Sequence, residues 1–173
     1  TINGTCSENL YIDRDLTKLQ GGTAAEIQGV APVESFDSPI VISGANVLLQ
    51  DLTITGIAGG NYGVIIADGG NARLTNVTVR NAEIHGILVT ENSNLDLIGS
   101  TVQGNTGSGV VLKKNSHADL EDGTQIVGNG NIALNILLNS SAELNDTTIE
   151  ASAEQCAVLV SEASSLRIVD GNT

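Results

Sequence analysis

The sequence repeats itself every 23 to 26 residues from Asn46 onward, and this repeat constrains the fold more than any other feature. Within each unit, aliphatic residues recur two places apart, which is the period of a β-strand and not of a helix. Each unit therefore predicts three short strands. The units are Asn46–Gly70, Asn71–Ser93, Asn94–Ser116, His117–Ser140 and Ser141–Ser164, with a partial unit from Ser165.

Aligned units place aliphatic residues in the same columns, and turns rich in Gly, Asn and Ser join the strands. One such unit cannot bury its apolar side alone, whereas stacked units bury it against neighbours about 4.8 Å away. We therefore predict an all-β fold, a β-solenoid of about seven coils of 23–26 residues with three short strands per coil. The clearest column contains Leu49, Leu74, Leu97, Leu120, Leu144 and Ile168.

The handedness follows from coil length, because left-handed β-helices are built from shorter and more regular hexapeptide coils. Long coils with variable turns favour a right-handed parallel β-helix, and the repeat pattern resembles the pectate-lyase-like superfamily. The opening segment Thr1–Ile12 also resembles the first coil of secreted bacterial right-handed β-helix proteins of unassigned function. The resemblance implies a secreted or cell-surface location. It is one of pattern and involves no signature motif.

The whole chain, residues 1–173, is expected to be one domain, with less regular first coils in 1–45 and regular repeats in 46–173. We expect both end coils to be uncapped, so that they are open sheet edges that suit end-to-end stacking or a fragment of a longer protein. No apolar run approaches the length that spans a membrane, and no leader precedes Thr1, so a mature or trimmed product is expected.

The charge balance is 20 acidic against 7 basic residues, a net charge of −13. Such an excess of negative charge argues against nucleic acid or an anionic membrane as a partner. It favours cations and an extracellular setting, so the expected partners are the chain itself, as a homo-oligomer or filament, or an extracellular glycan.

The two cysteines, Cys6 and Cys156, are expected in the first and last coils, about 29 Å apart along the axis. A disulfide needs Cα atoms within about 7 Å, so Cys6 should not pair with Cys156. In the look-alike family, a cysteine in this first coil bonds to a preceding cap. A missing upstream segment and an intermolecular bond both remain open for Cys6.

An outward column of charges is the best candidate for catalysis or metal binding. Asp96, Asp119 and Glu143 are expected about 4.8 Å apart on successive coils, close enough to share a proton or a calcium ion. Arg73 and Arg167 stand at the two ends of the column. The alternative is an exposed charge ladder in which the arginines relieve repulsion and solvent screens the rest.

The resemblance implies chemistries to compare with this column. Pectate lyases combine calcium-binding carboxylates with a basic residue, and polygalacturonases place Asp residues around a Gly-His-Gly segment. Neither set transfers residue by residue, since Ile84-His85-Gly86 lacks the first glycine and the Asp pairs. A basic residue near Asp119 would be one of Lys113, Lys114 and His117.

A sugar-processing cleft has little other support. The chain has three aromatic residues, Tyr11, Phe36 and Tyr62, and short turns throughout except at the Gly56–Tyr62 corner. Enzymes that act on polysaccharides use aromatic rings against sugar faces and long loops around a groove.

A second outward column breaks the expected pattern because it is aliphatic. An exposed stripe of this length implies a cover, such as a loop, another subunit or a binding partner. The alternative is that strand curvature and neighbouring turns already bury it. The candidate interface residues are Ile65, Leu88, Val111, Leu137, Leu138 and Leu159, with Asn135 interrupting the column.

Asparagines are expected to form the turn after the third strand. Asn92, Asn115 and Asn139 recur once per coil there, and asparagine tolerates left-handed backbone.

Taken together, the sequence favours an extracellular structural or binding β-solenoid that self-associates through its apolar stripe or its open ends. The alternative is a lyase, hydrolase or epimerase-like protein that acts on polysaccharide with the acidic column, with or without calcium.

Overall fold

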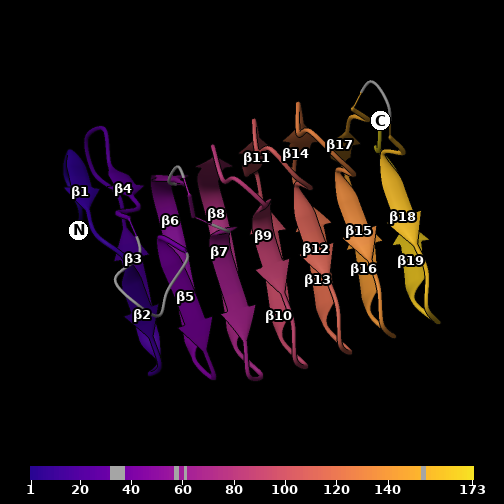
Figure 1. The fold of residues 1–173 in the computed structure, drawn as a ribbon, viewed down its shortest axis with the longest axis horizontal. Coiled ribbons are helices and arrows are strands. Elements are labelled where there is room, and N and C mark those ends of the chain that lie inside the picture. The colour runs from indigo at the N-terminus through magenta and orange to yellow at the C-terminus, as the bar shows by residue number, and fades with distance from the viewer. Residues whose placement is uncertain (32–37, 57–58, 61, 153–154) are drawn as a thin grey trace.

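The structure is a computed structural model that describes residues 1–31, 38–56, 59–60, 62–152 and 155–173. These residues form strands and turns and no helix, and every strand pairing is parallel. The strands wind into a solenoid whose coils follow one another along a single axis (Figure 1). The predicted all-β parallel β-solenoid is confirmed. Phe36 and part of the Gly56–Tyr62 corner lie outside the described residues.

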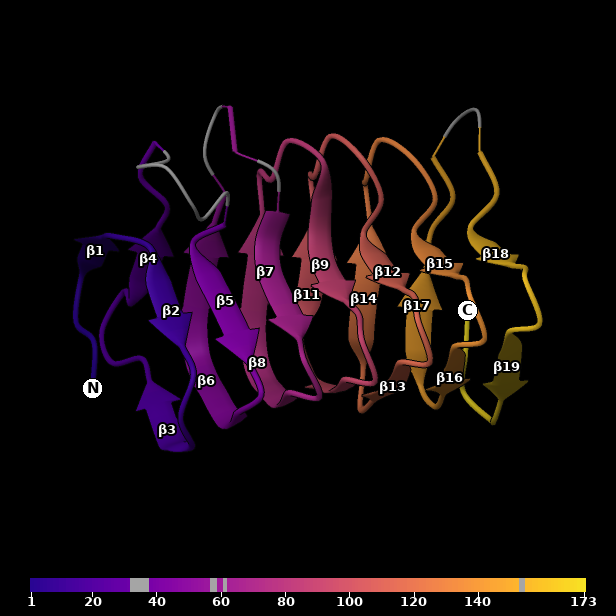
Figure 2. The same ribbon diagram turned by 60° about the horizontal axis from the view of Figure 1, so that its bottom comes forward.

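One side of the solenoid is a seven-stranded sheet made of one strand from each level (Figure 2). Seven levels correspond to about six complete turns, compared with the predicted seven coils. The strands are β2 (Leu10–Ile12), β5 (Ile40–Ser43), β7 (Tyr62–Ala67), β9 (His85–Val89), β12 (Val110–Leu112), β15 (Leu134–Ile136) and β18 (Val158–Val160).

The other side is a 12-stranded sheet that holds the first and second strands of each coil in two rows. The first row contains β3 (Leu16–Gln20), β6 (Asn46–Thr55), β8 (Asn71–Arg80), β10 (Asn94–Ile98), β13 (His117–Glu121), β16 (Ser141–Leu144) and β19 (Ser165–Ile168). The second row contains β1 (Thr5–Ser7), β4 (Glu26–Gln28), β11 (Thr101–Gln103), β14 (Thr124–Val127) and β17 (Thr147–Ile149), together with the distal halves of β6 and β8.

Two coils differ from the predicted three separate strands, because β6 and β8 run through the first corner as single ten-residue strands. A single left-handed residue turns the corner in each, Asp51 at φ 55° and Asn76 at φ 53°. The Asn76 Nδ2 donates to Asp51 Oδ1 at 2.8 Å, and this bond lowers the pKa of Asp51. In later coils the corner separates the strands, which gives the predicted three per coil.

The core is the predicted set of aliphatic ladders. The register pairs Leu49 with Leu74, Leu74 with Leu97, and Leu97 with Leu120, and each of these side chains is fully buried. Full burial of one such side chain stabilises the fold by about 1.5–3 kcal/mol. Because every level repeats the column, these ladders hold successive coils in register.

Polar ladders run inside the corners as well. The Asn129 Oδ1 accepts bonds from the Asn105 side chain at 2.9 Å and the Asn105 backbone N–H at 3.2 Å. The Asn105 Oδ1 in turn accepts from the Ala82 N–H at 2.9 Å. Both asparagines are buried, so these bonds satisfy groups that water does not reach.

The turns after β7, β9, β12, β15 and β18 each use two consecutive left-handed residues. After β9, β12 and β15 the second is the predicted asparagine, with φ near 60° at Asn92, Asn115 and Asn139, and Asn139 Nδ2 donates to Asn115 Oδ1 at 2.7 Å. These turns follow one another along the lower edge of the solenoid in Figure 2. The first left-handed residue of each turn varies, and the four that follow β9, β12, β15 and β18 are Glu91, Lys114, Leu138 and Glu162.

Candidate functional site

The acidic column lies on the outer face of the 12-stranded sheet. The register pairs Asp96 of β10 with Asp119 of β13, and Asp119 with Glu143 of β16. Arg73 of β8 precedes them and Arg167 of β19 follows them in the same column. The strand spacing thus brings the three carboxylates onto adjacent levels.

Each carboxylate in this column has its own partner. Asp96 Oδ2 accepts from both Nε and Nη2 of Arg73, at 3.0 and 2.7 Å. Glu143 binds the Arg167 guanidinium, and the hydrogen bond and the charge of Glu143 raise the pKa of Arg167. The remaining carboxylate, Asp119 Oδ1, lies 2.9 Å from His117 Nε2.

The pairing of the acids limits what the column does chemically. No three His, Cys, Asp or Glu side chains in the described part of the chain gather as a group that could hold a metal ion. The three carboxylates are more than one-third exposed, so water screens them from one another. The geometry is that of an ion-paired charge ladder with arginines at its ends.

Of the three basic candidates near Asp119, the structure brings only His117 to the acid. The His117 Nδ1 lies 2.8 Å from Ser141 Oγ, so both ring nitrogens have partners. Lys114 Nζ instead donates to Glu91 at 2.7 Å. Lys113 is half-buried and makes no ion pair with any described residue.

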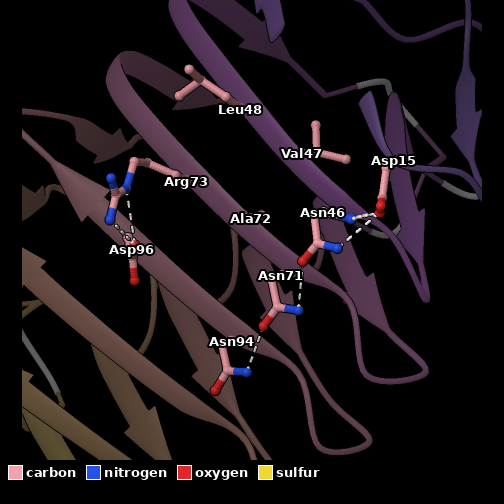
Figure 3. Close-up of a pocket in the computed structure, with 9 residues that line it drawn as sticks. All are labelled: Asp15, Asn46, Val47, Leu48, Asn71, Ala72, Arg73, Asn94 and Asp96. Atoms are coloured by element: carbon pink, nitrogen blue, oxygen red, sulfur yellow. Dashed lines mark hydrogen bonds and ion pairs between the residues drawn. The ribbon is translucent and has the colours of Figure 1, made fainter. Parts of the chain in front are cut away.

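A depression of about 470 Å³ lies beside the Arg73–Asp96 end of the acidic column (Figure 3). An asparagine ladder forms one side, with Asn94 donating to Asn71 at 2.7 Å, Asn71 to Asn46 at 3.0 Å, and Asn46 to Asp15 at 2.8 Å. The Asn46 backbone N–H also donates to Asp15 and lowers the pKa of that carboxyl.

The Arg73–Asp96 pair and Leu48 line another part of the depression. The asparagine ladder of Asn46, Asn71 and Asn94 was not predicted from the sequence. Asn opens these three successive units, which indicates an outward amide repeated on each level. The ladder satisfies its own hydrogen bonds along the axis, as expected of a structural element.

His85, in the Ile84-His85-Gly86 segment, is placed as a structural residue. Its Nδ1 accepts from the Ser108 backbone N–H at 3.1 Å, and its ring lies 5.7 Å from the Tyr62 ring. Burial lowers the pKa of His85, and the nearby charge of Lys113 lowers it further.

The two cysteines are free thiols. Cys6 lies in β1 at one end of the solenoid, and Cys156 shortly precedes β18 at the other (Figure 2). A hydrogen bond to Glu8 raises the pKa of the Cys6 thiol, which lowers its reactivity as a nucleophile.

The aliphatic stripe is exposed only in part. Leu88 and Val111, in the middle, are 6% and 5% exposed. Leu138 and Leu159 are 43% and 38% exposed. The stripe therefore reaches solvent mainly near β15 and β18, where Leu137 is half-buried.

Across the residues that the structure describes, no helix is both long and apolar enough to cross a membrane.

Comparison with known families agrees with this architecture. Residues 38–173 match the sequence model of the family described as "Right handed beta helix region". No curated protein and no solved structure shows significant similarity to the chain. Because the matched segment covers most of the sequence and the same residues form the regular coils, the chain belongs to the right-handed β-helix family.

Proposed function

We propose that the chain is an extracellular structural or binding β-solenoid that self-associates through the exposed part of its aliphatic stripe. We name this surface the flank patch and define it as Leu137, Leu138 and Leu159. Leu159 directly follows Asn135 in its column, and Leu137 lies two residues beyond Asn135. Diagonal neighbours at this spacing are within reach of leucine side chains, so Leu137 and Leu159 can form one apolar surface, and Leu138 follows Leu137 directly in the chain.

Leu138 is the observation that carries the proposal. It has φ 53°, a left-handed conformation that is costly for a leucine, and 43% of its surface reaches solvent. The same turn position in the adjacent coils holds the charged residues Lys114 and Glu162. The turn therefore does not require a leucine, and the exposed part of Leu138 supports a role in binding.

Sedimentation velocity over a range of concentrations tests the proposal. Leu138→Asn and Leu159→Asn are expected to abolish association. Asn135 already occupies the equivalent of Leu159 in the adjacent coil, and asparagine tolerates the left-handed backbone at position 138. Ile84→Asn is the matched control, because Ile84 is a 38% exposed aliphatic residue outside the patch. Association that survives both patch variants would refute the proposal.

The acidic face supports an alternative function through one observation, the depression beside Asp96. In this alternative the face would bind or cleave an acidic polysaccharide, with Asp119 and His117, which lie outside the depression, as the acid–base pair. Turnover of a uronic-acid polymer, with or without added calcium, that is lost in Asp119→Ala would establish this alternative. The proposed function expects the native protein to show no turnover.

The extracellular location is part of the proposal. The net charge of −13 keeps the chain soluble, and the resemblance of its first coil to secreted β-helix proteins supports export.

A further inference from the structure

The turn residues around Leu138 form an ordered column along the solenoid axis. Backbone bonds fix the order: Asn92 N–H donates to Lys114 O at 3.0 Å, Asn115 N–H to Leu138 O at 3.0 Å, and Asn139 N–H to Glu162 O at 2.9 Å. Lys114, Leu138 and Glu162 thus occupy successive levels, and all three are exposed. From Lys114 onward the column is positive, apolar and negative along the axis, and Glu91, one level before Lys114, is paired with Lys114.

This order is self-complementary under a two-fold rotation. An axis through Leu138, perpendicular to the solenoid axis, reverses the column in a second copy. Leu138 then meets the same residue of the second copy, while Lys114 of each copy faces Glu162 of the other. A two-fold interface requires one patch to complement itself, and this column satisfies that condition in both apolar contact and charge.

We infer that the partner of the flank patch is a second copy of this chain, packed side by side and antiparallel about a two-fold axis through Leu138. The inference rests on the proposed function and specifies the partner and its orientation. The contact places Leu137, Leu138 and Leu159 of both copies at its centre. Two Lys114–Glu162 pairs flank that centre.

The charge distribution of the whole chain favours this surface over others. Each copy carries a net charge of −13, so two copies repel one another over most approaches. Lys113 and Lys114 place two of the seven basic residues beside the patch. Lys113 makes no ion pair with any described residue, and Lys114 keeps its intramolecular bond to Glu91. The two lysines therefore reduce the local repulsion at this flank.

Two experiments test the orientation. The first introduces Leu138→Cys with Cys6→Ser and Cys156→Ser, and adds oxidised glutathione. Two-fold packing brings the two introduced thiols together, so disulfide-linked dimers are expected in high yield. Ile84→Cys in the same background is the control and should form no disulfide-linked dimer after oxidation.

The second experiment is a charge exchange. Lys114→Glu and Glu162→Lys should each weaken the dimer by about tenfold or more, since each loses two interfacial ion pairs. The double variant should restore native affinity, because each exchanged residue again faces its opposite charge. Circular dichroism of each variant verifies that the coils remain folded.

The outcomes separate the inference from the proposed function. Loss of association in Leu138→Asn, without cross-linking at position 138 and without rescue by the double variant, overturns the two-fold packing and leaves the flank patch in place. A different side-by-side packing through the flank patch would give that result, whereas head-to-tail stacking of solenoid ends would not depend on Leu138. No effect of Leu138→Asn on association overturns both.

Discussion

Replacing Leu138 by asparagine should leave the free energy of unfolding almost unchanged, although the substitution removes a leucine. Two terms of similar size oppose one another. The left-handed backbone, at φ 53°, costs a leucine about 1–2 kcal/mol, and asparagine is among the residues that adopt this conformation most readily.

The opposing term is the loss of apolar burial. Leu138 is 43% exposed, so somewhat more than half of its surface is covered in the fold. Full burial of a leucine contributes about 1.5–3 kcal/mol, and the covered part therefore contributes about 1–1.5 kcal/mol. The net change in the free energy of unfolding is expected to lie within about 1 kcal/mol of zero.

Thermal denaturation followed by circular dichroism measures this change. For a chain of 173 residues, 1 kcal/mol shifts Tm by about 2–4 °C, so the Tm of Leu138→Asn should lie within about 4 °C of the native value. Leu134→Asn is the contrasting variant, because Leu134 is fully buried and its replacement should unfold the coil. A fall in Tm of more than about 8 °C for Leu138→Asn would show that this leucine holds the fold together and would refute the strain argument.

Three further predictions concern the turns, the inner ladders and pH. Ala163→Asn should raise Tm by about 1–4 °C, because Ala163 has φ 61° in the column where Asn139 bonds Asn115; an unchanged or lower Tm would contradict this. Asn129→Leu should lower the free energy of unfolding in urea by about 2–4 kcal/mol, because it leaves the buried Asn105 amide and backbone N–H without an acceptor; a loss below 1 kcal/mol would count against the ladder. Burial lowers the pKa of His85 from its ordinary value of 6.5, so the unfolded chain binds a proton at this histidine more tightly than the folded chain does. The free energy of unfolding should therefore fall as pH drops below 6.5. His85→Gln should flatten this slope, and an identical slope in that variant would assign the proton to another group.

The fold was largely predictable from the sequence because its strongest signal is repeated. Each level contributes an independent copy of the same aliphatic columns, so Leu74, Leu97 and Leu120 specify one register several times over. The left-handed asparagine turns were predictable for the same reason. The merging of two strands in β6 and β8 was not, because it depends on the backbone angles of single residues, Asp51 and Asn76.

The candidate sites were less predictable, because exposure and pairing depend on side-chain positions. The sequence places Leu88 and Leu159 in one outward column, but only the packed coils show that Leu88 is covered and Leu159 is exposed. Similarly, three carboxylates in a column indicate a metal site until their partners are known. The strain at Leu138 also required the structure, although its place between Lys114 and Glu162 is readable from the repeat.

The mass of the native protein in solution, measured by light scattering at increasing concentration, tests the central claim most directly. Self-association through the flank patch predicts a mass that rises from the 17.7 kDa of one chain to a plateau at twice that value. A mass that stays at 17.7 kDa up to millimolar concentration would contradict it, as would growth without a plateau.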